Sequence, residues 1–204
     1  MSKVIGLSGP QGGGKSTLLK GLKEKGYHVD DFKVSREVQK RLGWDSLEHA
    51  YDSAETMMQF QNTILTVKRD RDLDNIMSDE HEIILTERTF ADIAVYTQMW
   101  TEKLLLADKW DLEQATKFTL NFYRDAGELQ YLYAGNIYLP SMPHIKWEDD
   151  PHRAKQEDIL EFEANISMFF DSWQPAEIPF FHVTAASVED RIEETVKWLT
   201  LELA

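Results

Sequence analysis

The chain alternates short apolar runs with longer amphipathic segments, which predicts strands separated by helices. The first run, KVIGLSG at residues 3–9, is expected to form a buried strand. A glycine-rich loop follows, and the segment from residue 15 has leucines at helical spacing and ends near Gly26, a common helix terminator. YHVDDF at residues 27–32 is expected to form the second strand.

The same alternation continues to the end of the chain. A helical pattern covers residues 45–78, with a break near 51–53, and EIILTER at 82–88 has the consecutive apolar residues typical of a buried parallel strand. Further helices are expected at 90–106, 111–127, 155–173 and 188–203, and strands at 135–140 and 180–185. The pattern predicts an α/β fold, a three-layer α/β/α sandwich around a mostly parallel sheet of about five strands. Residues 1–204 are expected to form one domain with a lid-like polar segment around 143–156.

The composition limits which cellular compartment and which classes of binding partner are expected. The 204 residues include no cysteine, which excludes disulfides and thiolate metal sites. No apolar run reaches membrane-spanning length and no signal-peptide pattern is present, so we expect a cytoplasmic protein without a membrane partner. The net charge of −14 disfavours a general nucleic-acid partner but leaves a local basic groove open.

The loop after the first strand carries the most specific motif. GPQGGGKS at residues 9–16 has the Walker A spacing GxxxxGK[ST], between a predicted strand and a predicted helix. Glycines let the backbone amides of the loop surround a phosphate, and the positive N-terminal end of the following helix also attracts the phosphate. Lys15 is expected to reach the phosphates of ATP, and Ser16 to contact Mg²⁺. The expected ATP-binding residues of the loop are Gly9, Gln11, Gly12, Gly13, Gly14, Lys15, Ser16 and Thr17.

Other segments indicate which kind of P-loop protein this is. No guanine-reading [NT]KxD segment is present, and the strand at 82–88 ends in Glu-Arg, where AAA-type ATPases usually have an acidic pair. ERTFADIAVYTQ at 87–98 resembles the Glu-Arg-Ser motif of deoxyribonucleoside kinases and the Asp-Arg…Ala-Tyr-Gln motif of thymidylate kinases. FQNTILTVKR at 60–69 resembles the Phe-Gln-Thr segment with which deoxynucleoside kinases hold a base. IPFFHV and HIKWEDDPHR are similar to the last strand and the lid of nicotinamide-riboside kinase-like proteins, which are common in phage genomes.

This resemblance to P-loop nucleoside and nucleotide kinases implies roles for residues at the strand ends. Asp30 or Asp31 would accept the proton of the acceptor hydroxyl, or both are solvated turn aspartates. Alternation along the strand turns them to opposite faces, so at most one is expected to be catalytic. Glu87 would hold Mg²⁺ and Arg88 would contact the acceptor or the transferring phosphate, unless the two form a structural ion pair. Arg36 would hold a monophosphate on the acceptor, or lie exposed on a helix.

Two predicted helices carry the residues expected to bind the acceptor. Phe60 offers a face for stacking and Gln61 an amide, although any amphipathic helix can present a buried Phe beside an exposed Gln. Lys68 lies two turns beyond Gln61 and either continues that surface or is solvated. Asp92 and Tyr96 share a helix face, which either faces the acceptor or divides between surface and core.

Two further arginines lie in the C-terminal part of the chain. Arg153, with Lys155, would reach the phosphates when the lid closes and excludes water, or would belong to an ordinary charged loop. Deoxynucleoside kinases carry several lid arginines and this segment has one, which leaves the identity of the acceptor open. Arg191 is expected beside the adenine of ATP, or on a helix surface. The oligomeric state is not readable from the sequence, although related kinases often form a homodimer through helices that flank the substrate site.

Together these features predict an ATP- and Mg²⁺-dependent kinase that phosphorylates a nucleoside or a nucleoside monophosphate. Two other classes stay open. A viral-type kinase would act on a base or an end of a polynucleotide, which the net charge disfavours. A non-enzymatic P-loop ATPase switch is disfavoured by the acceptor-side residues.

Overall fold

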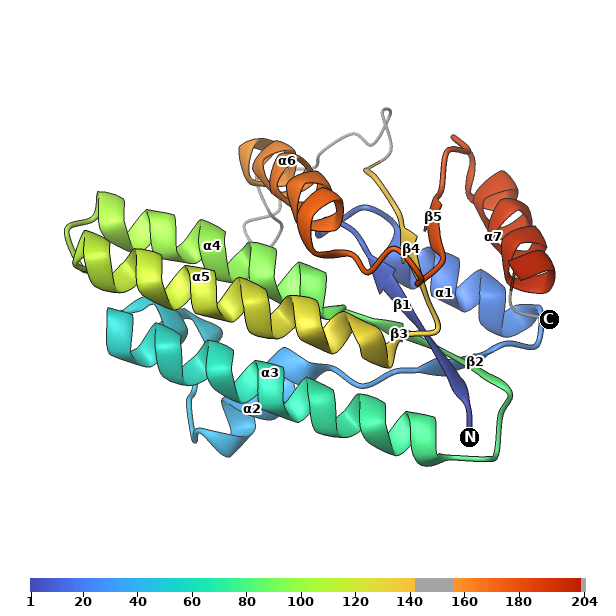
Figure 1. Cartoon of the computed structure of the whole chain (residues 1–204), viewed down its shortest axis with the longest axis horizontal. Helices are drawn as coiled ribbons and strands as arrows, with labels where there is room; N and C mark the ends of the chain where they lie inside the picture. Colours follow the sequence, from blue (N-terminus) through green and yellow to red (C-terminus); the bar gives the residue numbers. More distant parts are fainter. Residues whose placement is uncertain (142–155, 203–204) are drawn as a thin grey trace.

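A parallel sheet forms the centre of the molecule (Figure 1). The computed structural model describes residues 1–141 and 156–202. Its strands are β1 (Lys3–Ser8), β2 (His28–Asp30), β3 (Ile83–Glu87), β4 (Gly135–Tyr138) and β5 (Phe180–His182). The α-helices are α1 (Lys15–Glu24), α2 (Val34–Arg41), α3 (Ala54–Met77), α4 (Phe90–Leu106), α5 (Leu112–Leu129), α6 (Gln156–Trp173) and α7 (Val188–Glu202), and 3₁₀ turns cover Leu47–Tyr51 and Gln130–Leu132.

The strand order is β2-β3-β1-β4-β5, and every pair is parallel. The register places Leu7 of β1 beside Glu87 of β3, and Ser8 of β1 beside Tyr138 of β4. All five carboxyl ends therefore point to one edge of the sheet, where open α/β sheets bind their ligands.

Alternation along β1 divides the core between two layers. Ile5 and Leu7 are buried on one side, with leucines of α1 and with Leu199 of α7. Val4 is buried on the other side, in a larger cluster that includes Phe60 of α3 and residues of α4, α5 and α6. Figure 1 shows α1 and α7 together beside the sheet, and α3, α4 and α5 together on the other side. The expected three-layer α/β/α sandwich with five strands is thus confirmed, and the sheet is entirely parallel.

Most helices begin and end close to where the sequence pattern predicts. Helix α2 is the exception. The expected break near residues 51–53 is the start of α3, where Ser53 and Thr56 form a capping box. Helix α2 was not predicted, because it has eight residues of which only Val34 and Val38 are buried, and Lys33 at its N-cap makes no side-chain cap. Its packing against α3 and Leu47–Tyr51, rather than a local signal, accounts for it.

Candidate active site

The Walker loop follows β1 at the carboxyl edge of the sheet and leads into α1. Gly9 has a φ of +153°, and a Cβ there would lie 2.3 Å from the carbonyl oxygen of Leu139 after β4. Gly14 at the start of α1 has a φ of +91°, in the left-handed region that favours glycine. The loop therefore needs glycine at both of its ends, as a phosphate-binding loop does.

Lys15 is buried within this loop. Its ammonium group donates hydrogen bonds to the carbonyl oxygens of Gly9 and of Pro10, the latter at 2.8 Å. Burial lowers the pKa of Lys15 to about 8, although the nearby Asp92 carboxylate opposes the shift. Ser16 and Thr17 are exposed in the first turn of α1 and stay accessible to a bound phosphate or cation.

Helix α4 holds the Walker loop through two side chains one turn apart. Asp92 Oδ1 accepts a hydrogen bond from the Gly9 amide at 3.0 Å, and the Tyr96 hydroxyl accepts one from the Gln11 amide at 3.2 Å. Asp92 is fully buried and also caps α4 by accepting from the Thr89 amide at 2.9 Å. The expectation that Asp92 faces the acceptor is wrong, because its carboxylate is used in fixing the loop and the helix start.

The end of β3 brings two charged residues next to the loop. Arg88 has a φ of +62°, a strained conformation for a residue other than glycine, and its guanidinium lies 4.7 Å from the centre of the Tyr96 ring. Burial disfavours its charge, but Tyr96, Asp92 and Glu87 outweigh this and raise the pKa of Arg88. Glu87 is not paired with Arg88. Instead, it accepts a hydrogen bond from the ammonium group of Lys33.

A cavity of about 590 Å³ opens beside these residues. The predicted residues that line it are Gln11, Arg36, Phe60, Gln61, Glu87, Arg88 and Tyr96. The lining residues that the sequence analysis did not find include Phe32, Lys33, Tyr51, Trp100, Lys103 and Asp158. Trp100 and Lys103 follow Tyr96 at spacings of four and seven, so extending the helix face beyond Tyr96 would have found them. The 3₁₀ turn that carries Tyr51 gives no such signal.

The inner wall of the cavity combines aromatic rings with one amide. Phe60 is buried and stacks on Trp44, with ring centres 5.7 Å apart. Gln61 beside it is only 3% exposed, yet its side-chain amide makes no hydrogen bond to any residue that the structure describes. Buried amides are normally hydrogen-bonded, so this one is free to bind a ligand in the cavity.

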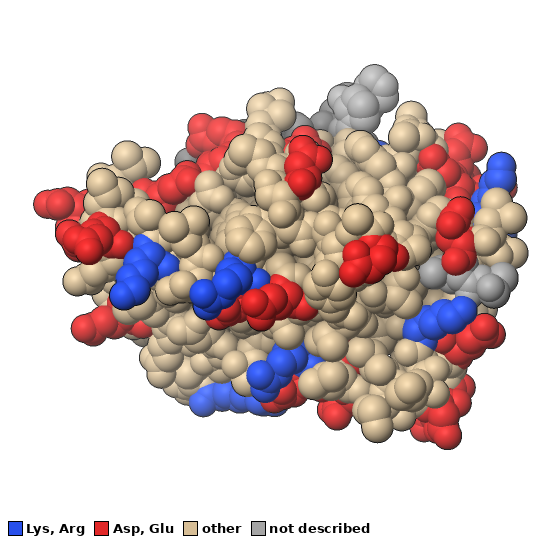
Figure 2. All heavy atoms as spheres, in the orientation of Figure 1, with Lys and Arg blue, Asp and Glu red and all other residues tan. Residues whose placement is uncertain are grey.

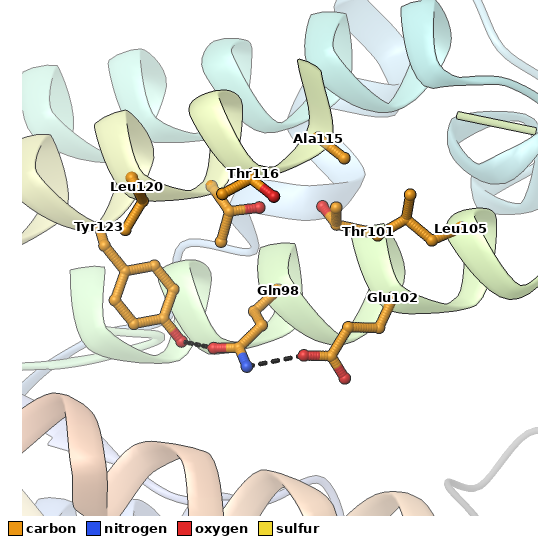
Figure 3. Close-up of a pocket in the computed structure, with 9 residues that line it drawn as sticks. Gln98, Thr101, Glu102, Leu105, Ala115, Thr116, Leu120 and Tyr123 are labelled. Carbon is orange, nitrogen blue, oxygen red and sulfur yellow. Dashed lines mark hydrogen bonds between the residues drawn. The ribbon is translucent and has the colours of Figure 1, made fainter. Parts of the chain in front are cut away.

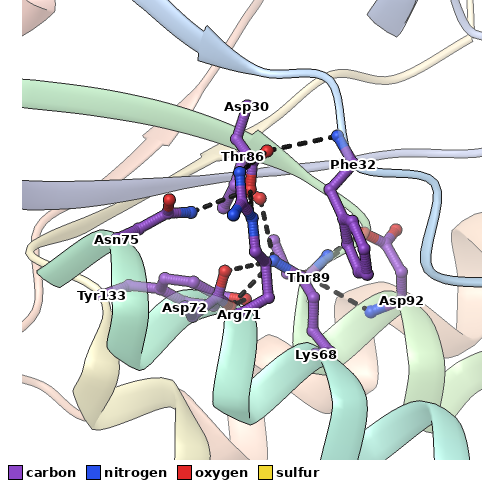
Figure 4. Close-up of polar contacts among 10 residues, drawn as sticks. All are labelled: Asp30, Phe32, Lys68, Arg71, Asp72, Asn75, Thr86, Thr89, Asp92 and Tyr133. Atoms are coloured by element: carbon purple, nitrogen blue, oxygen red, sulfur yellow. Dashed lines mark hydrogen bonds and ion pairs between the residues drawn. The ribbon is translucent and has the colours of Figure 1, made fainter.

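Asp30 is part of a buried network and does not line the cavity (Figure 4). Arg71 of α3 donates to both of its carboxylate oxygens, at 2.9 and 3.0 Å, and Asn75 donates at 2.8 Å. Burial opposes the charge, but Arg71 and Asn75 outweigh it and lower the pKa of Asp30. The role of proton acceptor is therefore wrong for Asp30. Asp31 is largely exposed, and its carboxylate accepts from Lys23 of α1 at 3.3 Å.

Lys68 is neither solvated nor part of the acceptor surface. Its ammonium group is buried, and it donates to Asp72 at 2.6 and 2.8 Å and to the Thr86 hydroxyl at 2.8 Å (Figure 4). Tyr133 donates to the same Asp72 carboxylate at 2.9 Å. The lysine turns inward because this carboxylate lies one helical turn further along α3, and it anchors α3 to β3.

Of the two C-terminal arginines expected at the site, only Arg191 lies in the described part of the structure. Arg191 is 3% exposed, and its guanidinium donates to the carbonyl oxygens of Ala185 at 2.8 Å, Pro140 at 3.1 Å and Gly13 at 3.4 Å. It ties α7 to the Walker loop, so the expected contact with adenine is replaced by a structural one. Arg153 and the expected lid lie outside the described residues.

A hollow of about 320 Å³ between α4 and α5 contains none of the predicted site residues, and Tyr123 there donates to Gln98 (Figure 3). No helix in the described residues is long and apolar enough to span a membrane.

Comparisons with known proteins place the chain among P-loop proteins. A family model described as an AAA domain matches residues 4–191. A search of curated proteins finds no significant match. Since β3 ends in Glu87-Arg88 and not in the acidic pair usual for AAA-type ATPases, the name of that family leaves the reaction open.

Solved structures agree in fold at low sequence identity. Deoxyadenosine kinase from M. mycoides with dCMP and dCDP bound is 18% identical, with a TM-score of 0.66, and 97% of this chain covers 98% of that one. The same enzyme with dATP bound gives 20% identity and a TM-score of 0.63, over 97% and 99% of the chains. NadR in complex with NR gives 13% identity and a TM-score of 0.65. The match covers 98% of this chain and 52% of the NadR chain.

Proposed function

The chain belongs to the family described as an AAA domain, and from its P-loop kinase-like fold and its cavity we propose an ATP-dependent kinase with a nucleoside or nucleoside monophosphate as acceptor. The free amide of Gln61 is the observation that carries the proposal. It lies in the same cavity as Glu87 and Arg88, beside the Walker loop. A switch or motor protein that only hydrolyses ATP has no need of such an amide. The solved deoxyadenosine kinase shares the fold and supports the reaction class.

The cavity suits a flat heterocycle attached to a sugar. Phe60, Tyr51 and Trp100 provide apolar and aromatic walls, and Gln61 can both donate to and accept from the edge of a base. The volume of about 590 Å³ lies within the range of small-molecule sites. Holding the base at this wall would direct the sugar toward Glu87, Arg88 and the Walker loop.

The residues at the other end of the cavity suit phosphoryl transfer. Lys15 and the loop amides would bind the phosphates of ATP, and Arg88 would stabilise charge on the transferring group. The acceptor oxygen forms a bond to the γ-phosphorus while the bond from that phosphorus to the β–γ bridging oxygen breaks. ADP leaves, and the hydroxyl proton, if the acceptor is a nucleoside, passes to a carboxylate and then to water.

Asp31 is the carboxylate that we propose for this proton. It follows β2 at the carboxyl edge of the sheet, directly before the cavity residues Phe32 and Lys33. Its side chain does not line the cavity in this structure, but its ion pair with Lys23 is exposed on both sides and holds it weakly, so the side chain is free to turn toward the cavity. The alternative proton acceptor is Glu87, whose carboxylate is already paired with Lys33.

The oxygen donors present fit Mg²⁺. Ser16 offers an exposed hydroxyl and Glu87 a carboxylate, while the described residues contain no group of three or more His, Cys, Asp or Glu that could hold a metal. This suits an ion that keeps several waters and binds mainly through one or two carboxylates and substrate phosphates. When bound, Mg²⁺ would neutralise charge on the phosphate oxygens.

An acceptor screen with matched glutamine variants tests the proposal. ADP release is measured with nucleosides, nucleoside monophosphates and nicotinamide riboside as acceptors. Gln61→Leu is expected to raise the KM of the best acceptor about tenfold or more, with the KM for ATP unchanged, because hydrogen bonds to a buried amide are lost. Gln59→Leu, at an exposed position on the same helix, is the control and should have no effect. Equal ADP release with and without every acceptor would instead favour a P-loop switch.

A further inference from the structure

A second groove, of about 450 Å³, lies along α2 beside the acceptor cavity. The two share Phe32, Lys33, Arg36 and Leu47 in their walls, so they adjoin each other. The groove adds Glu37, Gln39 and Lys40, which do not line the cavity. A substrate that fills the cavity can therefore extend past Arg36 onto the outside of α2.

The groove is cationic on a chain that is otherwise acidic. Arg36 and Lys40 are exposed, and neither has an ion pair or hydrogen bond with a described residue. The acid of the groove, Glu37, accepts from Arg41 at 3.0 Å. Figure 2 shows acidic side chains, with some basic ones among them, scattered over the face of the molecule seen there. At physiological salt, charges more than about 8 Å away are largely screened, so the local cations determine what binds here.

The cations form a row with a direction. Lys33, Arg36 and Lys40 are three and four residues apart, so they share one face of α2 at intervals of about one helical turn, roughly 5.4 Å. The row begins at Lys33, which contacts Glu87 in the cavity, and ends at Lys40 outside it. Phe32 and Leu47 add apolar surface along the way.

We propose that the acceptor carries phosphate beyond the sugar that is phosphorylated, and that Arg36 and Lys40 bind this phosphate. The acceptor is then the free hydroxyl end of a single-stranded nucleic acid, and a nucleoside 3′-phosphate is its shortest form. The inference rests on the proposed kinase function and on its transfer step, in which the strand's hydroxyl oxygen bonds to the γ-phosphorus, ADP leaves and the proton goes to water. The net charge of −14 does not exclude such a partner, because the nearby cations Arg36 and Lys40 determine the local field.

Three acceptors of increasing length test this proposal. Transfer from γ-labelled ATP is measured to deoxynucleosides, to their 3′-monophosphates and to five-nucleotide strands with a free 5′-hydroxyl. The proposal expects kcat/KM to rise about tenfold or more from the nucleoside to a phosphate-bearing acceptor. A gain for the 3′-monophosphate shows that the first phosphate is bound, as expected at Arg36, and a further gain for the strand shows that the next is bound, as expected at Lys40. Nucleosides as good as both longer acceptors would overturn the proposal.

Lys40→Ala separates this inference from the kinase function, because Lys40 lines only the groove. Transfer to the nucleoside should be unchanged, while the strand's kcat/KM should fall and the slope of log affinity against log salt should drop by about 0.7. Lys20→Ala, an exposed lysine on α1, is the control. An unchanged salt slope in Lys40→Ala would overturn the proposal. If no acceptor takes label at all, it is the kinase function that fails.

Discussion

Lys15 shows how burial of a single side chain sets a condition for function. Its ammonium group lies against carbonyl oxygens of its own loop, and burial lowers its pKa to about 8. A bound polyphosphate stabilises the protonated form, so the pKa rises in the complex. Binding of ATP should therefore take up a proton in the range between about pH 8 and this higher pKa.

The resulting prediction concerns the affinity for ATP as a function of pH. As pH rises above about 8, the free enzyme loses the lysine charge, and affinity should fall by up to about tenfold per pH unit. Equilibrium binding at constant ionic strength between pH 7 and 9.5 measures this. Lys15→Met should bind weakly at every pH without this decline, and should reduce transfer by about 10²-fold or more. A decline that persists in Lys15→Met would place the titrating group elsewhere.

Asp30 and Asp31 are neighbours with different expected roles, and two substitutions separate them. Asp30→Asn should lower the free energy of unfolding by about 1–3 kcal/mol at pH 7, because it weakens the bidentate bond to Arg71. Since the pKa of Asp30 is lowered in the folded state, this stability is present above the ordinary value of 3.8 and disappears as pH falls through the folded value. Urea unfolding at pH 7 and near pH 3 checks both statements. Equal stability of Asp30→Asn and wild type at pH 7 would contradict them.

Asp31→Asn should leave stability unchanged, because its ion pair is exposed. Transfer to a hydroxyl acceptor should fall by roughly 10²-fold or more with little change in ATP affinity, because the amide cannot take the proton. Single-turnover transfer measures the rate. If Asp31→Asn is as active as wild type while Glu87→Gln is inactive, the proton acceptor is Glu87.

At this scale, local motifs were predictable and long-range contacts were not. The Walker residues follow from spacing alone, and the glycine requirement is set by the loop's own backbone. Asp92 was misassigned because its partner Gly9 is distant in the sequence. Lys68 was misassigned although Asp72 is only one helical turn away, because the sequence does not show that this ion pair is buried. A charge on a helix face looks the same whether it points to substrate or to a buried carboxylate.

At the scale of elements, α4 connects the two halves of the proposed reaction. One face of this helix holds the Walker loop through Asp92 and Tyr96, and continues with Trp100 and Lys103 into the acceptor cavity. The Tyr96 ring also contacts the Arg88 guanidinium and lies 4.8 Å from the Phe162 ring of α6. A shift of α4 would therefore alter the loop and the cavity together.

Tyr96→Phe tests this connection, because it removes the hydroxyl and keeps the ring. Losing the bond from the Gln11 amide should weaken ATP binding about fivefold, which corresponds to a net hydrogen bond of about 1 kcal/mol. The contact between the ring and the Arg88 guanidinium remains and only the hydroxyl contact to Arg88 is lost, so kcat should change less than the affinity for ATP. The matched control is Tyr123→Phe in α5. It removes a hydroxyl that donates a hydrogen bond to Gln98, which lies on α4 like Tyr96 (Figure 3). Equal effects on ATP binding in both variants would indicate a general loss of helix packing.

The elements themselves were largely readable from periodicity. The range 90–106 matches α4, because a strong apolar pattern coincides with a capping box at Thr89 and Asp92. Helix α2 was missed because its two buried valines are too few to make a pattern, and its position depends on α3. The row of cations on α2 was consequently not recognised as a surface.

At the scale of the whole molecule, the alternation of strands and helices predicted the layers, and the fold of known nucleoside kinases agrees with it. The cavity could not be predicted in the same way, since it is built from α2, α3, α4, α6 and the end of β3. Only the folded sheet brings these segments together at its carboxyl edge. The central claim is that this edge transfers phosphate from ATP to an acceptor held at Gln61.

Direct observation of that transfer is the most decisive measurement. The wild-type protein is incubated with γ-labelled ATP, Mg²⁺ and nucleosides, nucleotides or short strands, and the products are separated. Label should appear covalently on one acceptor class, and Gln61→Leu should reduce this labelling while Gln59→Leu should not. Label found only in inorganic phosphate, at a rate independent of every acceptor and of Gln61, would contradict phosphate transfer to an acceptor at this site.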